Sequence, residues 1–502
     1  MDIFSHMVMG FSVALQPVNL LYCFAGVFIG TLIGVLPGIG PVGAMSMLLP
    51  VTFKSTPESA IIMLAGIYYG AMYGGSTTSI LVKIPGEAAS VVTCLDGYQM
   101  AREGRAGPAL GMAAFASFIA GTFSIVALML LSPPLSRLAL GFGPPEYFSL
   151  MIFGLTLLVY LAQGSISKAL LMAAIGLALG LVGTDAINAR PRFTFGRIEL
   201  LDGIGLTSLV MGLFGVSEVL LNVEQVLHRD VYEAKIKGLM PTARDWLESK
   251  GAVVRGSFIG FFLGILPGAG AVISSFLSYA VEKRVSRHPE RFGKGAVAGL
   301  AGPEAANNAA AGGAFIPLMT LGIPPNAVMA MLLAAFMIHG VQPGPMMIQQ
   351  HPGLFWGVIG SMYLGNVMLL ILNLPLIGLW VQVLRVPYRI LFPLILLFCL
   401  IGVYSVKNEP FDVYLMIFFG ALGYLMKKFD YESAPLVLAF VLGPMMENNL
   451  RKSLIMSDGE FSILFSRPLS AGCLILALVL LLSSLIPWLR RKREEMPKEE
   501  TS

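Results

Sequence analysis

A short apolar segment interrupted by proline and glycine occurs twice in this 502-residue chain. GVLPGIG at residues 34–40 returns as GILPGAG at residues 264–270, and each copy lies within a long uncharged stretch. A glycine-rich element follows each copy, at residues 69–79 and 304–313. Helix-breaking segments at matching places in two halves of a chain are typical of a secondary transporter, whose binding site they form.

Composition assigns the chain to the membrane proteins. Charged residues make up 12% of it, about half of their share in an ordinary soluble domain. No Lys, Arg, Asp or Glu occurs between Asp2 and Lys54 or between Glu304 and Arg385. Because a spanning helix needs about 20 apolar residues, the second window holds several passes. We therefore predict an all-α polytopic membrane protein embedded in the lipid bilayer.

The apolar segments predict about 12 transmembrane helices in two related repeats, which we expect to be inverted. The predicted division is an interfacial N-terminal segment (1–16), a first repeat (17–223), a partly helical cytoplasmic linker (224–252), a second repeat with terminal helices (253–489) and a cytoplasmic tail (490–502). The tail begins with four basic residues, which favour the cytoplasmic side.

Helices are expected near residues 17–36, 58–80, 108–132, 146–163, 166–183, 203–222, 254–280, 324–341, 353–381, 388–406, 411–427, 433–446 and 468–489. Residues 37–53 and 296–322 are apolar but contain Gly and Pro. We expect these two stretches to be discontinuous or re-entrant.

The repeated elements also indicate binding residues. Pro and Gly break a helix, and the exposed N-terminal end suits an anion while the C-terminal end suits a cation such as Na⁺. Hydroxyls or amides beside paired glycines can bind a carboxylate or an ion, although kinks and helix–helix contacts use the same residues. The candidate substrate- and ion-binding residues are Gly38, Gly40, Gly74, Gly75, Ser76, Thr77, Thr78, Lys83, Pro85, Gly268, Gly270, Asn307, Asn308, Gly312, Gly313, Pro324 and Asn326. Na⁺ is expected near Gly38, Gly40, Gly268 and Gly270.

Three ionisable residues near these elements have two interpretations each. Lys83 either binds an anionic substrate or extends to the membrane interface. Glu87 and Glu304 either bind a cation or proton or cap a helix. Capping is the expectation for Glu304, because it follows Pro303.

Other classes of protein lack support in the sequence. The four cysteines are far apart, and no metal-binding or nucleophile–base pattern occurs, so we predict neither an enzyme nor a bound cofactor. The net charge is +4, but the basic residues lie in short loops and do not form one continuous surface for binding nucleic acid. No phosphate-binding loop is present, but an ABC-type permease driven by a separate ATPase remains the alternative. Glu304-Ala305-Ala306 is similar to the coupling loop of such permeases, although the glycine expected after it is Ala310.

Four segments resemble the large membrane subunit (TctA) of the tripartite tricarboxylate transporters. They are GVLPGIGPVGAMSMLLPVTF, YYGAMYGGSTTSILVKIPGE, GPEAANNAAAGGAFIPLMTLGIPP and Gln342-Pro343-Gly344-Pro345. The resemblance extends from about residue 17 to 450.

This resemblance implies a multi-pass subunit of a symporter in the bacterial inner membrane, which imports di- or tricarboxylates such as citrate and is driven by a coupling cation, Na⁺ or H⁺. It implies two partners, a small membrane subunit of about four helices and a periplasmic solute-binding protein. Formation of a homodimer is left open. Both halves are then expected to converge on one site, and movement of one bundle against the other would give alternating access.

Overall fold

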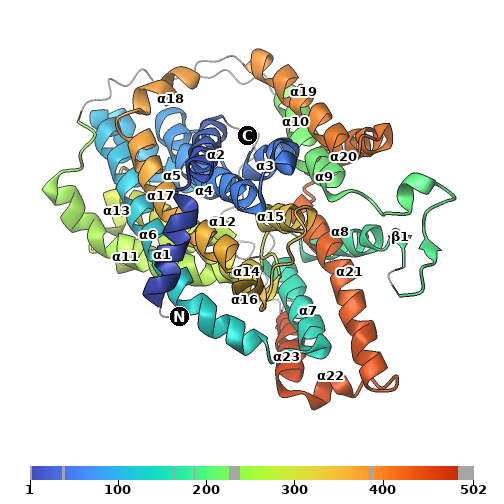
Figure 1. Ribbon diagram of the computed structural model, residues 1–502. Coiled ribbons are helices and arrows are strands. Elements are labelled where there is room, and N and C mark those ends of the chain that lie inside the picture. The colour runs from blue at the N-terminus through green and yellow to red at the C-terminus, as the bar shows by residue number, and fades with distance from the viewer. Residues whose placement is uncertain are drawn as a thin grey trace.

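Helices form nearly all of the structure, a computed structural model that describes residues 3–36, 40–161, 165–185, 187–224, 238–268, 270–384 and 388–483 (Figure 1). The helices of the first half are α1 (Ile3–Ala14), α2 (Pro17–Val35), α3 (Gly40–Leu48), α4 (Pro57–Val82), α5 (Thr93–Met100), α6 (Ala106–Ala139), α7 (Pro144–Leu161), α8 (Ile166–Gly180), α9 (Leu206–Val210) and α10 (Ser217–Glu224). Short 3₁₀ or π turns lie at η1 (Leu49–Lys54), η2 (Ala88–Val91), η3 (Ala101–Arg105), η4 (Ile198–Leu200) and η5 (Met211–Val216).

The second half continues in the same way. Its helices are α11 (Ala243–Ile265), α12 (Gly270–Val285), α13 (Val297–Gly313), α14 (Phe315–Leu321), α15 (Ala327–Ile338), α16 (Met347–Gln350), α17 (Pro352–Asn373), α18 (Ile377–Val383), α19 (Tyr388–Lys407), α20 (Pro410–Lys428), α21 (Ser433–Met456), α22 (Ile463–Ser466) and α23 (Pro468–Ser483), with a 3₁₀ turn η6 (Pro289–Arg291). The described strands are β1 (Gly183–Thr184) and β2 (Pro191–Arg192), an antiparallel pair in which Gly183 lies opposite Arg192.

Helix length and polarity agree with a membrane protein. Five described helical stretches are long and apolar enough to cross a bilayer, namely Pro17–Val35, Thr93–Ala139, Pro144–Leu161, Pro352–Asn373 and Pro410–Lys428. Further apolar helices of 10–17 residues occur in both halves. The predicted all-α membrane class is confirmed, while the count of 12 passes and the inversion of the repeats stay predictions.

Both copies of the repeated segment separate two helices. α2 ends at Val35 and α3 begins at Gly40, while α11 ends at Ile265 and α12 begins at Gly270. The prediction of one continuous helix over 254–280 is therefore wrong. Pro267 has no N–H to continue the helix, and Gly268 and Gly270 adopt positive φ angles of 82° and 51°, which are unstrained only for glycine.

The expected single helix over 353–381 is also divided. α17 ends at Asn373, and α18 begins only at Ile377. Pro375 lies in the gap and cannot donate the backbone hydrogen bond that a continuous helix needs there.

Helix α2 lies beside α4, and α11 lies beside α13 (Figure 1). Rows of glycines line both contacts. A Cβ atom on Gly26, Gly30 or Gly34 would lie 2.3–2.5 Å from a backbone oxygen of α4. On the other pair, a Cβ on Gly256, Gly260 or Gly264 would lie 2.1–2.3 Å from a backbone oxygen of α13. Small residues every fourth position allow this close helix contact. Both halves therefore share one packing pattern just before their breaks.

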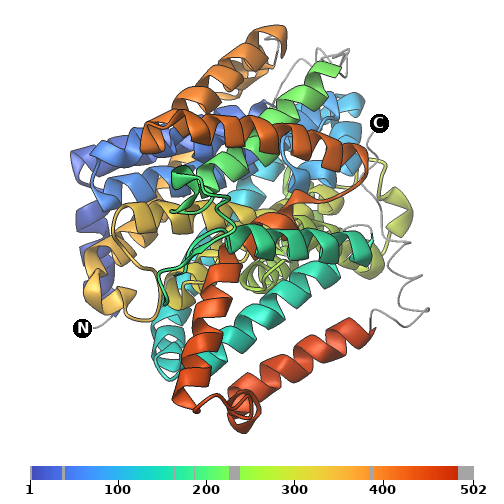
Figure 2. The same cartoon turned by 90° about the vertical axis from the view of Figure 1, so that its right-hand side faces the viewer.

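The remaining helices surround these two pairs. α6 packs against α13, and α17 crosses α2, α4 and α6, so that α17 contacts helices of the first half. At the opposite end of the molecule α23 lies beside α7, and α21 packs against both α7 and α8 (Figure 2). α4 occupies the centre: all of its residues from Ser59 to Leu81 are buried.

Candidate functional site

A buried carboxylate on α13 marks the point where the two halves meet. Glu304 is fully buried, and its Oε2 accepts hydrogen bonds from Ser76 Oγ at 2.6 Å and Ser117 Oγ at 3.3 Å. Its Oε1 accepts a short hydrogen bond from Thr93 Oγ1. The three donors come from α4, α5 and α6 of the first half, while Glu304 belongs to the second.

The expectation that Glu304 caps a helix is wrong. α13 begins at Val297, with Ala296 at its N-cap position, and continues through Pro303 to Gly313. Glu304 therefore lies inside the helix, where its side chain turns to the hydroxyls of neighbouring helices instead of to free N–H groups of its own.

The carboxylate of Glu304 has hydrogen-bond donors but no cationic partner in the described part of the chain. The ion pairs found there all involve other acids. An ionised carboxylate removed from water costs several kcal/mol unless it is paired. A proton or a small cation would offset that cost. Intramembrane acids of this kind are functional candidates by default.

A second acid, Glu87, lies next to this group. Its Oε1 accepts from Asn307 Nδ2 at 3.0 Å, and its Oε2 accepts from the backbone N–H of Ala89 at 2.7 Å. Glu87 therefore caps the short turn η2, as one of its two interpretations expected, and also contacts α13. Asn307 is 1% exposed, and its Oδ1 accepts no hydrogen bond.

The predicted polar residues of the glycine-rich elements converge on these acids. Ser76 donates to Glu304, and Asn308 Nδ2 donates to Ser117 Oγ at 2.7 Å and to the Glu304 backbone oxygen at 3.1 Å. Thr78 Oγ1 donates to the carbonyl oxygen of Val35 at 2.7 Å. That bond ties α4 to the last residue of α2, immediately before the break.

The predicted glycines allow close packing around the same place. A Cβ on Gly74 would lie 2.2 Å from Thr31 O, and one on Gly75 would lie 2.8 Å from Glu87 Cγ. On α13, a Cβ on Gly312 would meet Ser124 Oγ at 2.1 Å, and one on Gly313 would meet Phe261 O at 2.5 Å. These four glycines let α4 and α13 pack closely against their neighbours, and Gly75 does so directly beside Glu87.

The breaks contribute backbone rather than side chains. Gly40 has a φ of 62°, and the N–H of Gly268 donates to Pro325 O at 3.0 Å. This bond connects the second break to the Pro324-Pro325 segment, where Pro324 is buried. Gly270 starts α12, and Gly38 lies outside the described residues.

Two predicted residues lie at exposed or capping positions. Lys83 is exposed and ends α4 in a left-handed conformation, with φ of 59°, and Pro85 two residues later is partly buried. Asn326 caps α15 by accepting the Met329 N–H at 2.9 Å, and its Nδ2 reaches Tyr68 Oη at 3.5 Å. Both Lys83 and Asn326 stay candidates, and neither contacts Glu304 in the hydrogen bonds described.

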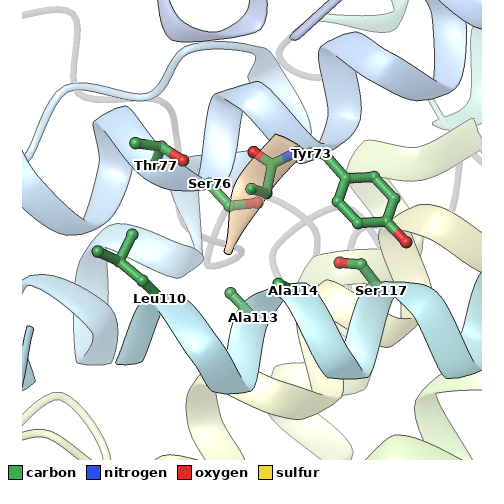
Figure 3. A pocket seen from close by; sticks show the side chains of 8 residues that line it. Tyr73, Ser76, Thr77, Leu110, Ala113, Ala114 and Ser117 are labelled. Atoms are coloured by element: carbon green, nitrogen blue, oxygen red, sulfur yellow. The ribbon is translucent and has the colours of Figure 1, made fainter. Parts of the chain in front are cut away.

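A small pocket opens beside the Glu304 hydrogen bonds (Figure 3). Its cavity volume is about 10 Å³, close to the least that one water molecule needs. Its polar walls are Tyr73, Ser76, Thr77, Ser117 and Asn373, and its apolar wall is Leu110, Ala113 and Ala114. In Figure 3, Ser76 and Thr77 of α4 face the Leu110–Ser117 segment of α6 across it.

Sequence reasoning missed Thr93, Ser117 and Asn373. Each is a single polar residue with no glycine pair or repeat beside it, so local sequence gives no signal. Ser117 of α6 and Asn373 of α17 can be recognised as site residues only from the tertiary contacts that place them beside α4.

Comparison with known proteins identifies the family. The model of the tripartite tricarboxylate transporter TctA family matches residues 20–438. An Agrobacterium vitis protein named "Uncharacterized 52.8 kDa protein in TAR-I ttuC' 3'region" is 50% identical over 500 residues, covering all of both chains. "Uncharacterized protein in TAR-II ttuC' 3'region" from the same organism is 52% identical over 241 residues, which are 48% of this chain and all of that one. No solved structure matches the chain. The predicted resemblance is confirmed: the chain belongs to the tripartite tricarboxylate transporter TctA family.

Proposed function

We propose that this chain is the permease subunit of a binding-protein-dependent secondary transporter, which imports di- or tricarboxylates such as citrate together with a coupling cation. The family assignment supports transport of tricarboxylates. The observation that carries cation coupling is Glu304, a fully buried acid that three hydroxyls from the other half contact. A buried negative charge without a basic partner provides a place for a cation, not for a free anion.

Energetics favour coupling as well. A carboxylate anion that enters a cell with a negative interior moves against about 2.3 kcal/mol per charge per 100 mV. Cations that enter with it offset this cost. The proposed substrate path runs past the two breaks, because the helices that begin after them, α3 and α12, present free N-terminal N–H groups that suit anionic groups.

Alternating access is the proposed mechanism. The pocket beside Ser76 has a cavity volume of about 10 Å³, far smaller than the few hundred Å³ of an ordinary ligand site. The conformation described is therefore closed around this point, and a carboxylate requires the halves to separate. The proposed partners are a small membrane subunit and a periplasmic solute-binding protein, and the proposed location is the bacterial inner membrane.

Uptake into proteoliposomes tests the function. Vesicles would contain this chain with its small membrane subunit, and a binding protein would be supplied outside with labelled citrate or other carboxylates. Uptake that follows an imposed Na⁺ or H⁺ gradient without ATP would support the proposal. Uptake that ignores both gradients and requires ATP would overturn it in favour of an ABC-type permease.

A further inference from the structure

The pocket between α4, α6 and the end of α17 offers a ligand several side-chain oxygen atoms. Besides Tyr73, whose hydroxyl donates to Asn366 Oδ1 at 2.6 Å, four side chains present oxygen atoms that can accept: Ser76, Thr77, Ser117 and Asn373. The lining side chains include no Lys, Arg or His. A small space surrounded by oxygen acceptors suits a cation.

The hydroxyls of Ser76 and Ser117 are already oriented. Both donate their protons to Glu304 Oε2, at 2.6 Å and 3.3 Å. A hydroxyl oxygen keeps two lone pairs when its proton is donated, and Asn308 Nδ2 uses one of those on Ser117. Each hydroxyl therefore retains at least one lone pair for a ligand. The charge of Glu304 also polarises both hydroxyls, which makes their oxygens better cation ligands.

Asn373 supplies an independent observation. Its side chain is 4% exposed, and its Nδ2 donates to Leu369 O at 2.9 Å. Its Oδ1 is buried and accepts no hydrogen bond from the residues that the structure describes, although Asn373 lines the pocket. A buried acceptor without a partner costs about 1–3 kcal/mol. A bound ion would remove this cost.

The end of α17 adds to the negative potential. Asn373 is the last residue of this 22-residue helix, and a helix C-terminus carries a partial negative charge from its free carbonyl groups. The C-terminal end of α17 and the nearby carboxylate of Glu304 both make the electrostatic potential in the pocket more negative. Together they attract one positive charge, whereas a divalent ion would require several direct carboxylate ligands.

We propose that this pocket binds one Na⁺ ion through Ser76 Oγ, Thr77 Oγ1, Ser117 Oγ and Asn373 Oδ1, with Glu304 balancing its charge through the two serines. The inference rests on the proposed function, since it identifies the coupling cation and its site. It places the ion on side chains of α4, α6 and α17, and not on the glycines of the helix breaks near which the sequence suggested Na⁺. Ser117 and Asn373 thereby become ion ligands that no sequence motif indicated.

Direct binding of ²²Na⁺ to the purified full chain in lipid nanodiscs tests the site without substrate, partners or a gradient. Wild type should bind one Na⁺ saturably. Asn373→Leu and Ser117→Ala should each weaken binding by at least about tenfold, because even indirect partners of a bound metal contribute that much. Asn373→Asp keeps the acceptor oxygen and should retain binding.

The matched control is Ser132→Ala, which removes another buried hydroxyl of α6. Ser132 Oγ donates to Leu128 O within its own helix, so binding should equal that of wild type. Size-exclusion profiles show whether each variant is folded. If Asn373→Leu does not fold, the comparison of ²²Na⁺ affinity between Ser117→Ala and Ser132→Ala tests the site.

The possible failures are separable. Wild-type affinity in folded Ser117→Ala and Asn373→Leu would overturn the site while leaving Na⁺-driven uptake intact. No saturable ²²Na⁺ binding to wild type would overturn the inference, and uptake driven by a pH gradient alone would then assign the coupling to protons. Uptake that needs ATP would overturn the proposed function itself.

Discussion

At the scale of single residues, Glu304 illustrates how a buried acid is held in a membrane protein. Its carboxylate is contacted by hydroxyls of Ser76, Thr93 and Ser117. Hydrogen bonds to a charged group contribute about 1.5–3 kcal/mol each. Each donor therefore stabilises the ionised form of Glu304, and with it the binding of a nearby cation.

Ser76→Ala removes one of these donors without adding volume. Because a bond of about 1.5–3 kcal/mol is lost, gradient-driven uptake should fall roughly tenfold or more while the protein remains folded. The measurement is initial uptake rate in proteoliposomes, normalised to incorporated protein. Ser46→Ala is the control, since Ser46 is also buried but bonds only to Val42 O of its own helix. Equal rates for Ser76→Ala and wild type would contradict the role of Ser76.

The sequence predicted part of this group. Ser76, Thr77, Asn307 and Asn308 could be selected because hydroxyls and amides beside paired glycines are conspicuous in apolar sequence. Glu304 was misassigned because a proline directly before an acid resembles a helix start. Its helix instead begins seven residues earlier, at Val297, and only the tertiary structure shows which hydroxyls it meets.

At the scale of helices, the glycine rows determine which elements can pack together. A Cβ on Gly74 would lie 2.2 Å from Thr31 O, a separation that no real side chain tolerates. Because the obstacle is backbone, the helices themselves would have to separate. The pairs α2–α4 and α11–α13 are therefore expected to behave as rigid units.

Gly74→Val should prevent correct assembly of α2 with α4. We expect little monodisperse protein after purification, measured by fluorescence-detected size exclusion. Gly472→Val is the matched control, because Gly472 lies in helix α23 with open space around its Cβ position, and its profile should match wild type. A normal profile for Gly74→Val would show that the α2–α4 contact is looser than described.

Asp96, in the first half of the chain, fixes the segment directly before α13 through hydrogen bonds. It is fully buried, and its Oδ1 accepts the backbone N–H groups of Gly293, Gly295 and Ala296 at 2.7–2.9 Å. Its Oδ2 accepts from Tyr279 Oη at 3.0 Å. This single side chain therefore caps the segment that leads into α13, including the N–H of its N-cap residue Ala296.

Asp96→Ala leaves three backbone donors and one hydroxyl without their acceptor. We expect the thermal midpoint to fall by several degrees, because unsatisfied buried donors cost about 1–3 kcal/mol each. Asp96→Asn keeps one acceptor oxygen and should lie between Ala and wild type. The measurement is thermal unfolding in detergent, followed by intrinsic fluorescence. An unchanged midpoint for Asp96→Ala would contradict the capping role.

The sequence located most helices and the interruption after α2, but not the interruptions at Pro267 and Pro375. Apolar length predicts a span, yet it does not tell whether Pro267 or Pro375 kinks a helix or ends it. The structure ends both helices. After Pro267 the chain leaves the helical conformation through positive φ angles at Gly268 and Gly270. Likewise, the contacts of α17 with four first-half helices, α1, α2, α4 and α6, depend on long-range packing that apolar patterning does not encode.

At the scale of the whole molecule, the two halves meet through polar contacts at the centre. All three hydroxyl donors to Glu304 belong to the first half. In the proposed alternating-access mechanism, the glycine-packed pairs on either side move as units, and these hydrogen bonds break and reform. That mechanism requires the pocket beside Thr77 to change from closed to open.

Ala113→Cys, at a pocket-lining residue that is not one of the proposed Na⁺ ligands, reports this opening. In the closed conformation the residue is 3% exposed, so a water-soluble thiol reagent should react slowly. The rate should rise when substrate, binding protein and a cation gradient allow turnover. The background would carry Cys473→Ser, because the other three native cysteines are buried. A reaction rate that turnover leaves unchanged would contradict alternating access at this point.

The most direct test of the account compares wild type with Glu304→Gln in reconstituted uptake of a labelled carboxylate, driven by an imposed Na⁺ gradient without ATP. Gln has nearly the same shape but no charge to balance a cation. The account predicts gradient-driven uptake by wild type and its loss in a folded Glu304→Gln protein. Uptake by Glu304→Gln at the wild-type rate, with the same dependence on Na⁺, would contradict it.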